Sequence, residues 1–326
     1  MDSTKFTVLD IGHGNCSLIE SSDSFTIIDA AQGNDVQNIL NEKSITQIDD
    51  LIISHSDKDH VGGAIAILLD DAVTVKRVHL NPDGIKTTAT WGDFRSALAY
   101  ARALHNTAIV TAINCDSPDL EYSDYCLEVL SPYAIDCVTG VGTLDGEGNK
   151  LDANSMSVVL RLKHNDENIA LIPGDMDSRT LEFLMREYDA LDAKILVFPH
   201  HGGRPGQGDP EGFAKLLCEK VNPDLILFSN SRFKHNNPIP AVISGAKQSN
   251  CGAHLACTQM STSCCEDKAS LSNEHLMSIY PSKGHTEKHS CAGSITIVLN
   301  GRDTDVSTPL EPHRHYITGF DSRKCV

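Results

Sequence analysis

The stretch DDLIISHSDKDHVGG, residues 49–63, decides the fold. Its first six residues contain the apolar run LII, which predicts a buried strand. Four of the next six residues can bind a metal ion: His55, Asp57, Asp59 and His60. Imidazole nitrogen and carboxylate oxygen suit zinc, manganese or iron, and loops at strand ends expose such groups to substrate. The stretch therefore predicts a metal centre at the end of a strand, with a charged, solvated loop as the alternative.

Outward from this stretch, short β-branched runs alternate with helix-like segments. Strands are predicted at residues 6–11, 16–20, 25–30, 126–132, 157–164, 168–175, 193–200, 223–230 and 295–301. Helices are predicted at residues 35–41, 61–70, 91–104, 179–189 and 210–220. This order predicts an α/β fold with helices outside two sheets.

One domain is predicted over residues 1–310, because no strong linker divides the chain. Within it, residues 248–292 are interpreted as a Cys/His-rich insertion, and residues 311–326 as a C-terminal tail without clear periodicity. The Gly- and Asp-rich loop at residues 140–154 links two groups of strands and could fold over a site.

The chain of 326 residues is acidic, with a formal net charge of -17. It has no apolar run of about 18 residues and no signal-peptide pattern, so a cytoplasmic protein without a membrane segment is expected. A non-specific DNA-binding protein would usually be basic. Either a protein partner presents a nucleic acid substrate, or the substrate is small; acidity that only favours solubility is a third interpretation.

The sequence from His55 to His60 resembles the metal-binding motif of the metallo-β-lactamase superfamily, in its HxDxDH form. Four further blocks resemble, in the same order, the hydrolase domain of the ComEC/Rec2 competence proteins: VLDIGHGNCSLIE, NSMSVVLRL, IALIPGDMD and ILVFPHHGG. The resemblance extends from about residue 6 to about residue 240. It implies an αββα sandwich with two divalent metal ions, zinc or manganese, at the edges of the sheets.

The resemblance also implies how the ligands are shared between the two metals. His55 and Asp57 would bind the first metal, and Asp59 and His60 the second. Asp175 of the PGDMD block would bridge the two ions and help them hold the attacking water. A simple Gly-Asp turn is the alternative interpretation of Asp175.

Later histidines complete the site that the resemblance implies. One of His200 and His201 should face the metals, as a ligand or as the acid that protonates the leaving group, and His200 is preferred. With Asp59, these two histidines form the predicted catalytic set. His235 would bind the second metal, although the family's His-Pro pair is replaced here by His-Asn-Asn-Pro.

The sequence departs from the family pattern in three places. Asp57 replaces the second His of the more common HxHxDH form, which favours Mn²⁺ or Mg²⁺ relative to Zn²⁺. The family's third motif lacks a clear His: Asn154 is in the right neighbourhood, and His164 is a later alternative on a predicted strand. His13 occupies a turn where the competence proteins more often have Gln, so it either reaches the substrate or is a turn residue.

Eleven cysteines are present, and five of them lie between residues 251 and 291. Thiolate and imidazole ligands suit a structural zinc, for which the predicted ligands are Cys257, Cys264 or Cys265, His289 and Cys291. Reduced surface thiols and a redox switch are the alternatives.

The function that these features predict is a metal-dependent hydrolase, specifically a phosphodiesterase or nuclease acting on DNA. Because the chain is acidic and has no membrane channel, we expect a soluble effector that works with a protein partner, for instance in a prokaryotic defence system. Hydrolysis of a small molecule, such as a cyclic nucleotide, lactone or thioester, is the second hypothesis. A non-catalytic binding module is the third.

Overall fold

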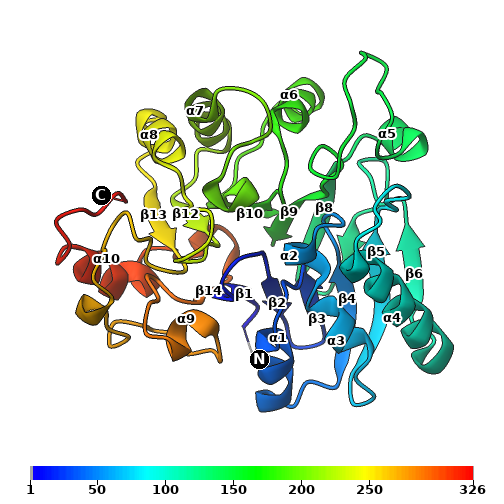
Figure 1. Cartoon of the computed structure of the whole chain (residues 1–326), viewed down its shortest axis with the longest axis horizontal. Coiled ribbons are helices and arrows are strands. Elements are labelled where there is room, and N and C mark those ends of the chain that lie inside the picture. The colour runs from blue at the N-terminus through cyan, green and yellow to red at the C-terminus, as the bar shows by residue number, and fades with distance from the viewer. Residues whose placement is uncertain (1–2, 326) are drawn as a thin grey trace.

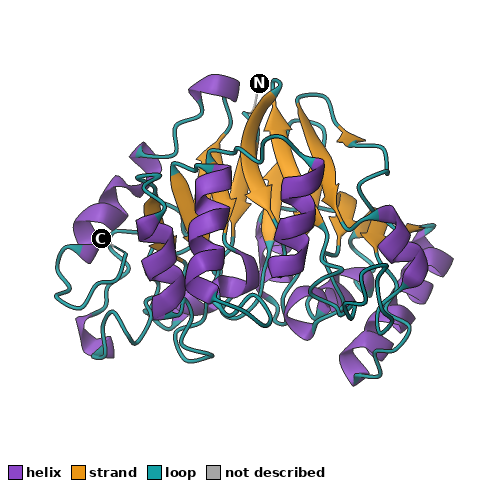
Figure 2. Cartoon of the chain, turned by 90° about the horizontal axis from the view of Figure 1, so that it is seen from above, coloured by secondary structure: helices purple, strands orange, loops and turns teal. Residues whose placement is uncertain are grey.

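A computed structural model describes residues 3–325. Two seven-stranded sheets lie face to face, and helices cover their outer faces (Figure 1, Figure 2). Helices α1, α3 and α4 lie on one outer side of the molecule, and α6, α7 and α8 lie on the other (Figure 1). The predicted α/β fold with helices outside two sheets is therefore confirmed.

The first sheet has the strand order β14-β1-β2-β3-β4-β5-β6. Its strands are β1 (Lys5–Val8), β2 (Ser17–Glu20), β3 (Phe25–Ile28), β4 (Gln47–Ile52), β5 (Thr74–Leu80), β6 (Ala108–Thr111) and β14 (Ile295–Val298). Pairing is antiparallel from β14 to β3 and parallel from β3 to β6. The carboxyl ends of the parallel strands therefore lie together at one edge of the sheet.

The second sheet has the strand order β13-β12-β11-β10-β9-β8-β7. Its strands are β7 (Leu120–Glu121), β8 (Tyr125–Ser131), β9 (Val159–His164), β10 (Glu167–Ile172), β11 (Ile195–Val197), β12 (Leu225–Phe228) and β13 (His254–Cys257). Pairing is parallel from β10 to β13 and antiparallel elsewhere. Both sheets thus have a parallel half, where loops can carry functional groups.

The helices connect the parallel strands. They are α1 (Asp35–Glu42), α2 (Lys58–Val61), α3 (Ala64–Leu68), α4 (Ala89–His105), α5 (Ala134–Thr139), α6 (Ser178–Glu187), α7 (Pro210–Val221), α8 (Pro240–Gln248), α9 (Lys283–Thr286) and α10 (Glu311–Ile317). Short 3-10 helices are η1 (Pro199–Gly202), η2 (Lys268–Ser270), η3 (Gly301–Asp303) and η4 (Thr308–Leu310). Within residues 3–325, no helix is both long and apolar enough to cross a membrane.

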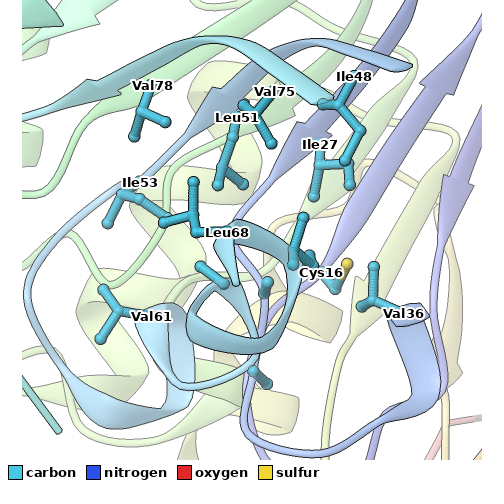
Figure 3. Packing of buried hydrophobic residues seen from close by; sticks show 14 of the residues in the cluster. Cys16, Ile27, Val36, Ile48, Leu51, Ile53, Val61, Leu68, Val75 and Val78 are labelled. Atoms are coloured by element: carbon cyan, nitrogen blue, oxygen red, sulfur yellow. The ribbon is translucent and has the colours of Figure 1, made fainter. Parts of the chain in front are cut away.

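Alternation along the strands builds three apolar layers. Ile27 and Leu51 pack with α1, α3 and α4 outside the first sheet (Figure 3), whereas the adjacent Ile28 and Ile52 pack between the sheets. Leu196 of β11 packs outside the second sheet, against α6 to α8. Successive side chains of a strand point to opposite faces, so apolar runs such as LII supply two layers at once.

The predicted helix at residues 61–70 is broken into α2 and α3. Gly62 and Gly63 separate the two helices because the segment passes very close to the loop after β3. A Cβ atom on Gly63 would lie 2.3 Å from the carbonyl oxygen of Ala31, and one on Gly62 would lie 2.8 Å from the Cβ of Gln32. The two glycines therefore let the metal-binding loop pack against the first sheet.

The Cys/His-rich region and the tail both take part in the fold. Residues 254–257 form β13, the edge strand of the second sheet, although residues 248–292 were interpreted as an insertion. Helix α10 occupies part of the predicted tail and packs Ile317 into the core outside the second sheet. The C-terminal segment is thus joined to the edge of this sheet.

Candidate metal centre

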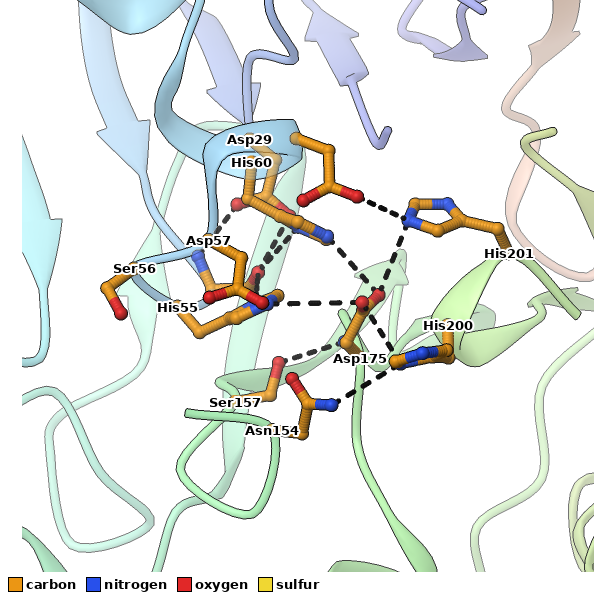
Figure 4. Close-up of polar contacts among 12 residues, drawn as sticks. Asp29, His55, Ser56, Asp57, His60, Asn154, Ser157, Asp175, His200 and His201 are labelled. Carbon is orange, nitrogen blue, oxygen red and sulfur yellow. Dashed lines mark hydrogen bonds and ion pairs between the residues drawn. The ribbon is translucent and has the colours of Figure 1, made fainter. Parts of the chain in front are cut away.

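The predicted metal-binding residues lie in loops that follow the parallel strands of both sheets. Residues 55–60 follow β4 and run into α2, while Asp175 follows β10. His200 and His201 lie in η1, directly after β11. Because the carboxyl ends of parallel strands meet at one edge of a sheet, these loops converge (Figure 4).

A first group of ligand atoms comes from His55, His60 and Asp175, all buried, and these atoms lie within 4.8 Å of one another. His60 Nε2 is 3.2 Å from Asp175 Oδ1, and His55 Nε2 is 3.9 Å from Asp175 Oδ2. Asp57 Oδ2 lies 3.7 Å from His55 Nε2, at the border of the group. The arrangement has the form of one metal position.

A second group comes from His13, Asp59 and His201, whose ligand atoms also lie within 4.8 Å of one another. Asp59 Oδ2 is 2.8 Å from His13 Nε2 and 3.5 Å from His201 Nε2. His201 Nε2 is also 3.8 Å from Asp175 Oδ1, so Asp175 lies between the two groups, where a bridging ligand is needed. The resemblance implied that His60 shares a metal with Asp59, but the structure groups His60 with His55 and Asp175.

Four buried ligand atoms have no hydrogen-bond partner in residues 3–325. They are the Nε2 atoms of His55, His60 and His201, and Asp175 Oδ1. Leaving a buried polar atom unpaired costs about 1–3 kcal/mol, and natural proteins rarely do so. One divalent cation in each group would together satisfy all four atoms, and imidazole with carboxylate suits zinc or manganese. The donor set therefore fits a metal centre.

Outer hydrogen bonds hold two of the imidazole rings in place. Asp29 Oδ2 lies 2.7 Å from His60 Nδ1, and the same carboxylate accepts hydrogen bonds from the backbone and side chain of Ser54. His201 Nδ1 donates to the carbonyl of Ser229 over 3.0 Å. With Nδ1 engaged, each ring presents Nε2 to the metal position, as metal-binding histidines commonly do.

His200 and His201 are consecutive residues, and both have a left-handed backbone. Their φ angles are 52° and 56°, which is unusual outside glycine. The His201 ring is buried in the second group, whereas 34% of the His200 side chain is exposed. His200 Nδ1 is 3.2 Å from Asp175 Oδ2 and 3.4 Å from Asn154 Nδ2. Both histidines therefore approach Asp175, but only His200 also reaches solvent.

Lys86, which belongs to neither ligand group, fixes the position of the Asp57 carboxylate. The Lys86 ammonium forms an ion pair with Asp57 Oδ1, and 38% of the Asp57 side chain is exposed. Lys86 belongs to the loop between β5 and α4, which Asp83 fixes by accepting a hydrogen bond from Ser56. This partner of Asp57 was not predicted from the sequence.

The surrounding histidines keep the two central carboxylates ionised. Burial alone would raise the pKa of Asp175, but the nearby His60 and His201 bring it well below its ordinary value. Burial would also raise the pKa of Asp59, but the neighbouring His13, His201 and His60 bring it below its ordinary value. Ionised carboxylates are the form that binds a cation.

The predicted ligand His235 and the alternative residue His164 both lie outside the two groups. His235 has a left-handed backbone with φ 61° and an exposed side chain, and its ring lies 4.8 Å from the His13 ring. His164 accepts a hydrogen bond from the backbone of Gly301 at Nδ1, so it joins β9 to η3. The structure brings His13 to the place that was predicted for His235.

The predicted structural-zinc ligands are only partly brought together. Cys257, Cys264 and Cys291 line one small cavity. His289 lies elsewhere, in the wall of the cavity described next, and the Cys265 thiol donates to the carbonyl of Asp267. The set with His289 and Cys265 is therefore corrected.

A cavity of about 570 Å³ lies beside the second group and shares His13 and Asp59 with it. Its wall is formed by Ile11, Gly12, His13, Gln32, Gly33, Asp35, Lys58, Asp59, Ser231, Phe233, Lys234, Gln259, Lys283 and His289. Three lysines thus face two carboxylates, which is a local excess of positive charge in an acidic protein. Burial raises the pKa of Asp35 to about 6, although Lys283 opposes this. We refer to this cavity as the lysine cavity.

His289 is the most unusual residue of the lysine cavity. Its side chain is 1% exposed, and neither ring nitrogen has a hydrogen-bond partner in the described chain. Burial lowers the pKa of His289, which favours the neutral ring. A buried imidazole without partners in a cavity wall is available to a ligand.

His13 is the main metal-site candidate whose placement the sequence left open. It stands between Gly12 and Gly14, both at positive φ. A Cβ atom on Gly14 would lie 2.3 Å from the Asp59 carbonyl oxygen, so this glycine lets the first hairpin pack directly on the metal-binding loop. The Gly-His-Gly sequence at residues 12–14 was the sequence feature that could have indicated a place for His13 in the metal site.

Comparisons with known proteins give one family match and several similar solved structures. Residues 9–138 match the family model described as the metallo-beta-lactamase superfamily. No curated protein matches the chain significantly. Similar solved structures include Tm1679, described as a metal-dependent hydrolase of the beta-lactamase superfamily, at 15% identity and a TM-score of 0.48, covering 78% of this chain and 95% of that one.

Two further similar structures come from named organisms. The metallo-beta-lactamase fold protein YhfI from Bacillus subtilis has 12% identity and a TM-score of 0.46, and covers 78% of this chain and 97% of its own. Zn(2+)-bound PqqB from Methylobacterium extorquens has 12% identity and a TM-score of 0.45, and covers 74% of this chain and 84% of its own.

Proposed function

Because residues 9–138 match the model of the metallo-β-lactamase superfamily, we propose that this metal-dependent hydrolase is a phosphodiesterase acting on nucleic acid or nucleotides. The observation that carries the proposal is the lysine cavity beside the second metal group. Lys58, Lys234 and Lys283 line its wall, and ammonium groups attract the phosphate of a substrate. A neutral lactone or thioester would gain nothing from them.

The chain's own residues have separate tasks in this proposal. Two metal ions, when bound, supply charge that stabilises the attacking and leaving oxygens of a displacement at phosphorus. Asp175 would lie between the ions, and His13, Asp59 and His201 would hold the ion next to the lysine cavity. His200 is partly exposed and 3.2 Å from Asp175, so it is placed to give a proton to the leaving oxygen.

DNA is the substrate class that the competence-protein resemblance supports. A net charge of -17 opposes capture of a long polyanion, so we propose that a basic protein partner presents the nucleic acid. Rapid degradation of DNA by the purified chain alone at physiological salt would refute the need for this partner.

A small nucleotide is the second candidate, and the volume of the lysine cavity favours it. About 570 Å³ lies within the range of pockets for small molecules. A cyclic nucleotide also contains one phosphodiester, and it suffers less long-range repulsion than DNA does. Competition between a cyclic nucleotide and single-stranded DNA in one assay separates the two candidates.

The test is hydrolysis of a synthetic phosphodiester by the purified chain loaded with Mn²⁺ or Zn²⁺. We expect turnover of the phosphodiester, little turnover of a matched lactone or thioester, and loss of activity in Asp175→Asn. Preference for the neutral esters, or full activity in Asp175→Asn, would refute the proposal.

The lysine cavity is tested with the double variant Lys58→Ala/Lys283→Ala. Removing two attractive charges should raise KM for the phosphodiester about tenfold or more, with a smaller effect on kcat. Lys220→Ala is the matched control, because Lys220 is an exposed lysine of α7 outside the cavity wall. Equal KM values in the double variant and the control would show that the cavity does not bind the substrate.

A further inference from the structure

Four cysteines from distant parts of the sequence line a second, much smaller cavity. Cys257 ends β13, Cys264 lies in the next loop, Cys291 precedes β14, and Cys325 is at the end of the described chain. The cavity has a volume of about 10 Å³, close to the size of one small particle such as a water molecule or a metal ion. We call these four residues the cysteine pocket.

Cysteines from four segments of the chain line this one pocket. Cys291 Sγ lies 3.2 Å from His313 Nε2 of α10. The side chains of Cys257, Cys264 and Cys291 are buried, at 2%, 8% and 2% exposure. Cysteine side chains from four chain segments therefore line one small interior space.

A second layer of groups supports the pocket. His313 Nδ1 lies 3.0 Å from His254 Nε2, so a chain of hydrogen bonds runs from His254 through His313 to Cys291. With Nδ1 facing His254, the His313 ring can donate its Nε2–H to the Cys291 sulfur. An imidazole that hydrogen-bonds a metal-binding sulfur is a common outer partner of zinc sites.

The cysteines of the pocket also pack in the apolar core outside the second sheet. An isolated buried cysteine behaves as a small hydrophobic residue, but here four cysteines share the wall of one cavity. No disulfide joins any of the cysteines in residues 3–325. Four thiolates around one point are the donor set that selects zinc.

We infer that Cys257, Cys264, Cys291 and Cys325 bind a structural zinc ion that is separate from the metal centre. The ion would join the C-terminal segment to β13, which is the edge strand of the second sheet. An exposed edge strand can form unwanted pairs with another chain. The C-terminal segment, anchored by the ion, would cover the edge at β13. A closed four-sulfur site leaves no position for substrate, so the ion would stabilise the fold and take no part in hydrolysis.

The experiment measures zinc in the full chain purified without added metal. The starting variant is His55→Ala/Asp59→Ala, which removes donors from both metal groups, so failure of the metal centre does not affect the result. We expect about one zinc per chain in this variant, and less than about one tenth after the further change Cys257→Ser/Cys264→Ser. Cys137→Ser, a change to a partly exposed cysteine outside the pocket, should leave the zinc content unchanged.

Cobalt provides a readout that does not depend on folding of the cysteine variants. Replacing zinc by Co²⁺ in the His55→Ala/Asp59→Ala variant should give the near-ultraviolet charge-transfer absorption of cobalt bound to thiolates. Absence of zinc, absence of this absorption, or retention of zinc in Cys257→Ser/Cys264→Ser would each overturn the inference. A chain 2 Da lighter than expected and free of zinc would show a disulfide instead.

Discussion

The contact between Asp29 and His60 gives a sharp test of how the metal centre is built. Asp29 accepts three hydrogen bonds, from Ser54 N, from Ser54 Oγ and from the His60 ring at Nδ1, at 2.7–2.8 Å. This carboxylate can only accept, so it keeps the His60 proton on Nδ1. Nε2 is then left with a lone pair that faces Asp175 Oδ1 at 3.2 Å.

Asp29→Asn should reverse this tautomer with little change of shape. The side-chain oxygen of the new amide must keep accepting the hydrogen bond from Ser54 N, because the side-chain NH₂ group in that position would face the Ser54 N–H, which is also a donor. The amide nitrogen then faces His60 Nδ1, which must accept, and the ring proton moves to Nε2. That proton would hydrogen-bond Asp175 and block the metal position. Loss of such outer partners costs about 10–100-fold in metal affinity, or about 1.4–2.7 kcal/mol.

The assay is calorimetric titration of Mn²⁺ into metal-free protein, paired with urea unfolding of the same samples. Asp29→Asn should bind at least tenfold more weakly while its unfolding transition stays cooperative. Asp29→Ala is the contrasting variant: it leaves three donors unpaired at about 1–3 kcal/mol each and should destabilise the fold itself. Affinity of Asp29→Asn within twofold of the wild type would refute the tautomer argument.

Three further predictions follow from particular contacts. Gly14→Ala, with φ of 129° and a Cβ 2.3 Å from the Asp59 carbonyl oxygen, should lower the free energy of unfolding by about 2 kcal/mol or more, whereas Gly84→Ala, in open space, should change it little in the same urea experiment. Burial raises the pKa of Asp10 from 3.8 to about 6, so the folded chain keeps a proton that the unfolded chain releases, and stability is lost as pH rises from about 4 to 6. Asp10→Asn keeps its contacts with Gln259 and Ser290, so its stability relative to wild type should grow across that interval, by up to about 3 kcal/mol; a constant difference from pH 4 to 7 would contradict this. Addition of Mn²⁺ at about 100 times its Kd should stabilise the metal-free chain by about 2.7 kcal/mol, measured as a rise in Tm that Asp175→Asn abolishes.

The elements that could be predicted from the sequence are those whose signal is local. Residues 25–30 and 49–54 alternate or run apolar over a few positions, and their strands lie where expected. Strand β5 was missed because Lys76 and Arg77 interrupt its apolar pattern. In the fold these cations pair with Asp49 and Asp50 of β4 at 2.6 Å, so the charges belong to the sheet surface.

The same division applies to the candidate site. The spacing of His55, Asp57, Asp59 and His60 is a local pattern, and three of these residues contribute to the two ligand groups. The partners that were missed are distant in sequence: Lys86 reaches Asp57 across 29 positions. His235 was expected on the strength of its position in a family pattern, but a changed loop leaves it exposed. Pairings of this kind depend on the completed fold, because nothing in the neighbouring sequence specifies them.

The metal centre and the stability of the chain are linked through the same atoms. Four unpartnered buried atoms at about 1–3 kcal/mol each amount to about 4–12 kcal/mol, which is comparable with the whole net stability of a typical domain. The chain can carry this cost only because the loops that present these atoms are fixed elsewhere, by Asp29 on Ser54, by Ser229 on His201 and by the close approach at Gly14. A bound cation then removes the cost of these unpaired atoms, which the fold holds in place before the cation binds. Selection for metal affinity therefore acts on residues that never touch the metal, and variants of those residues should separate binding from folding.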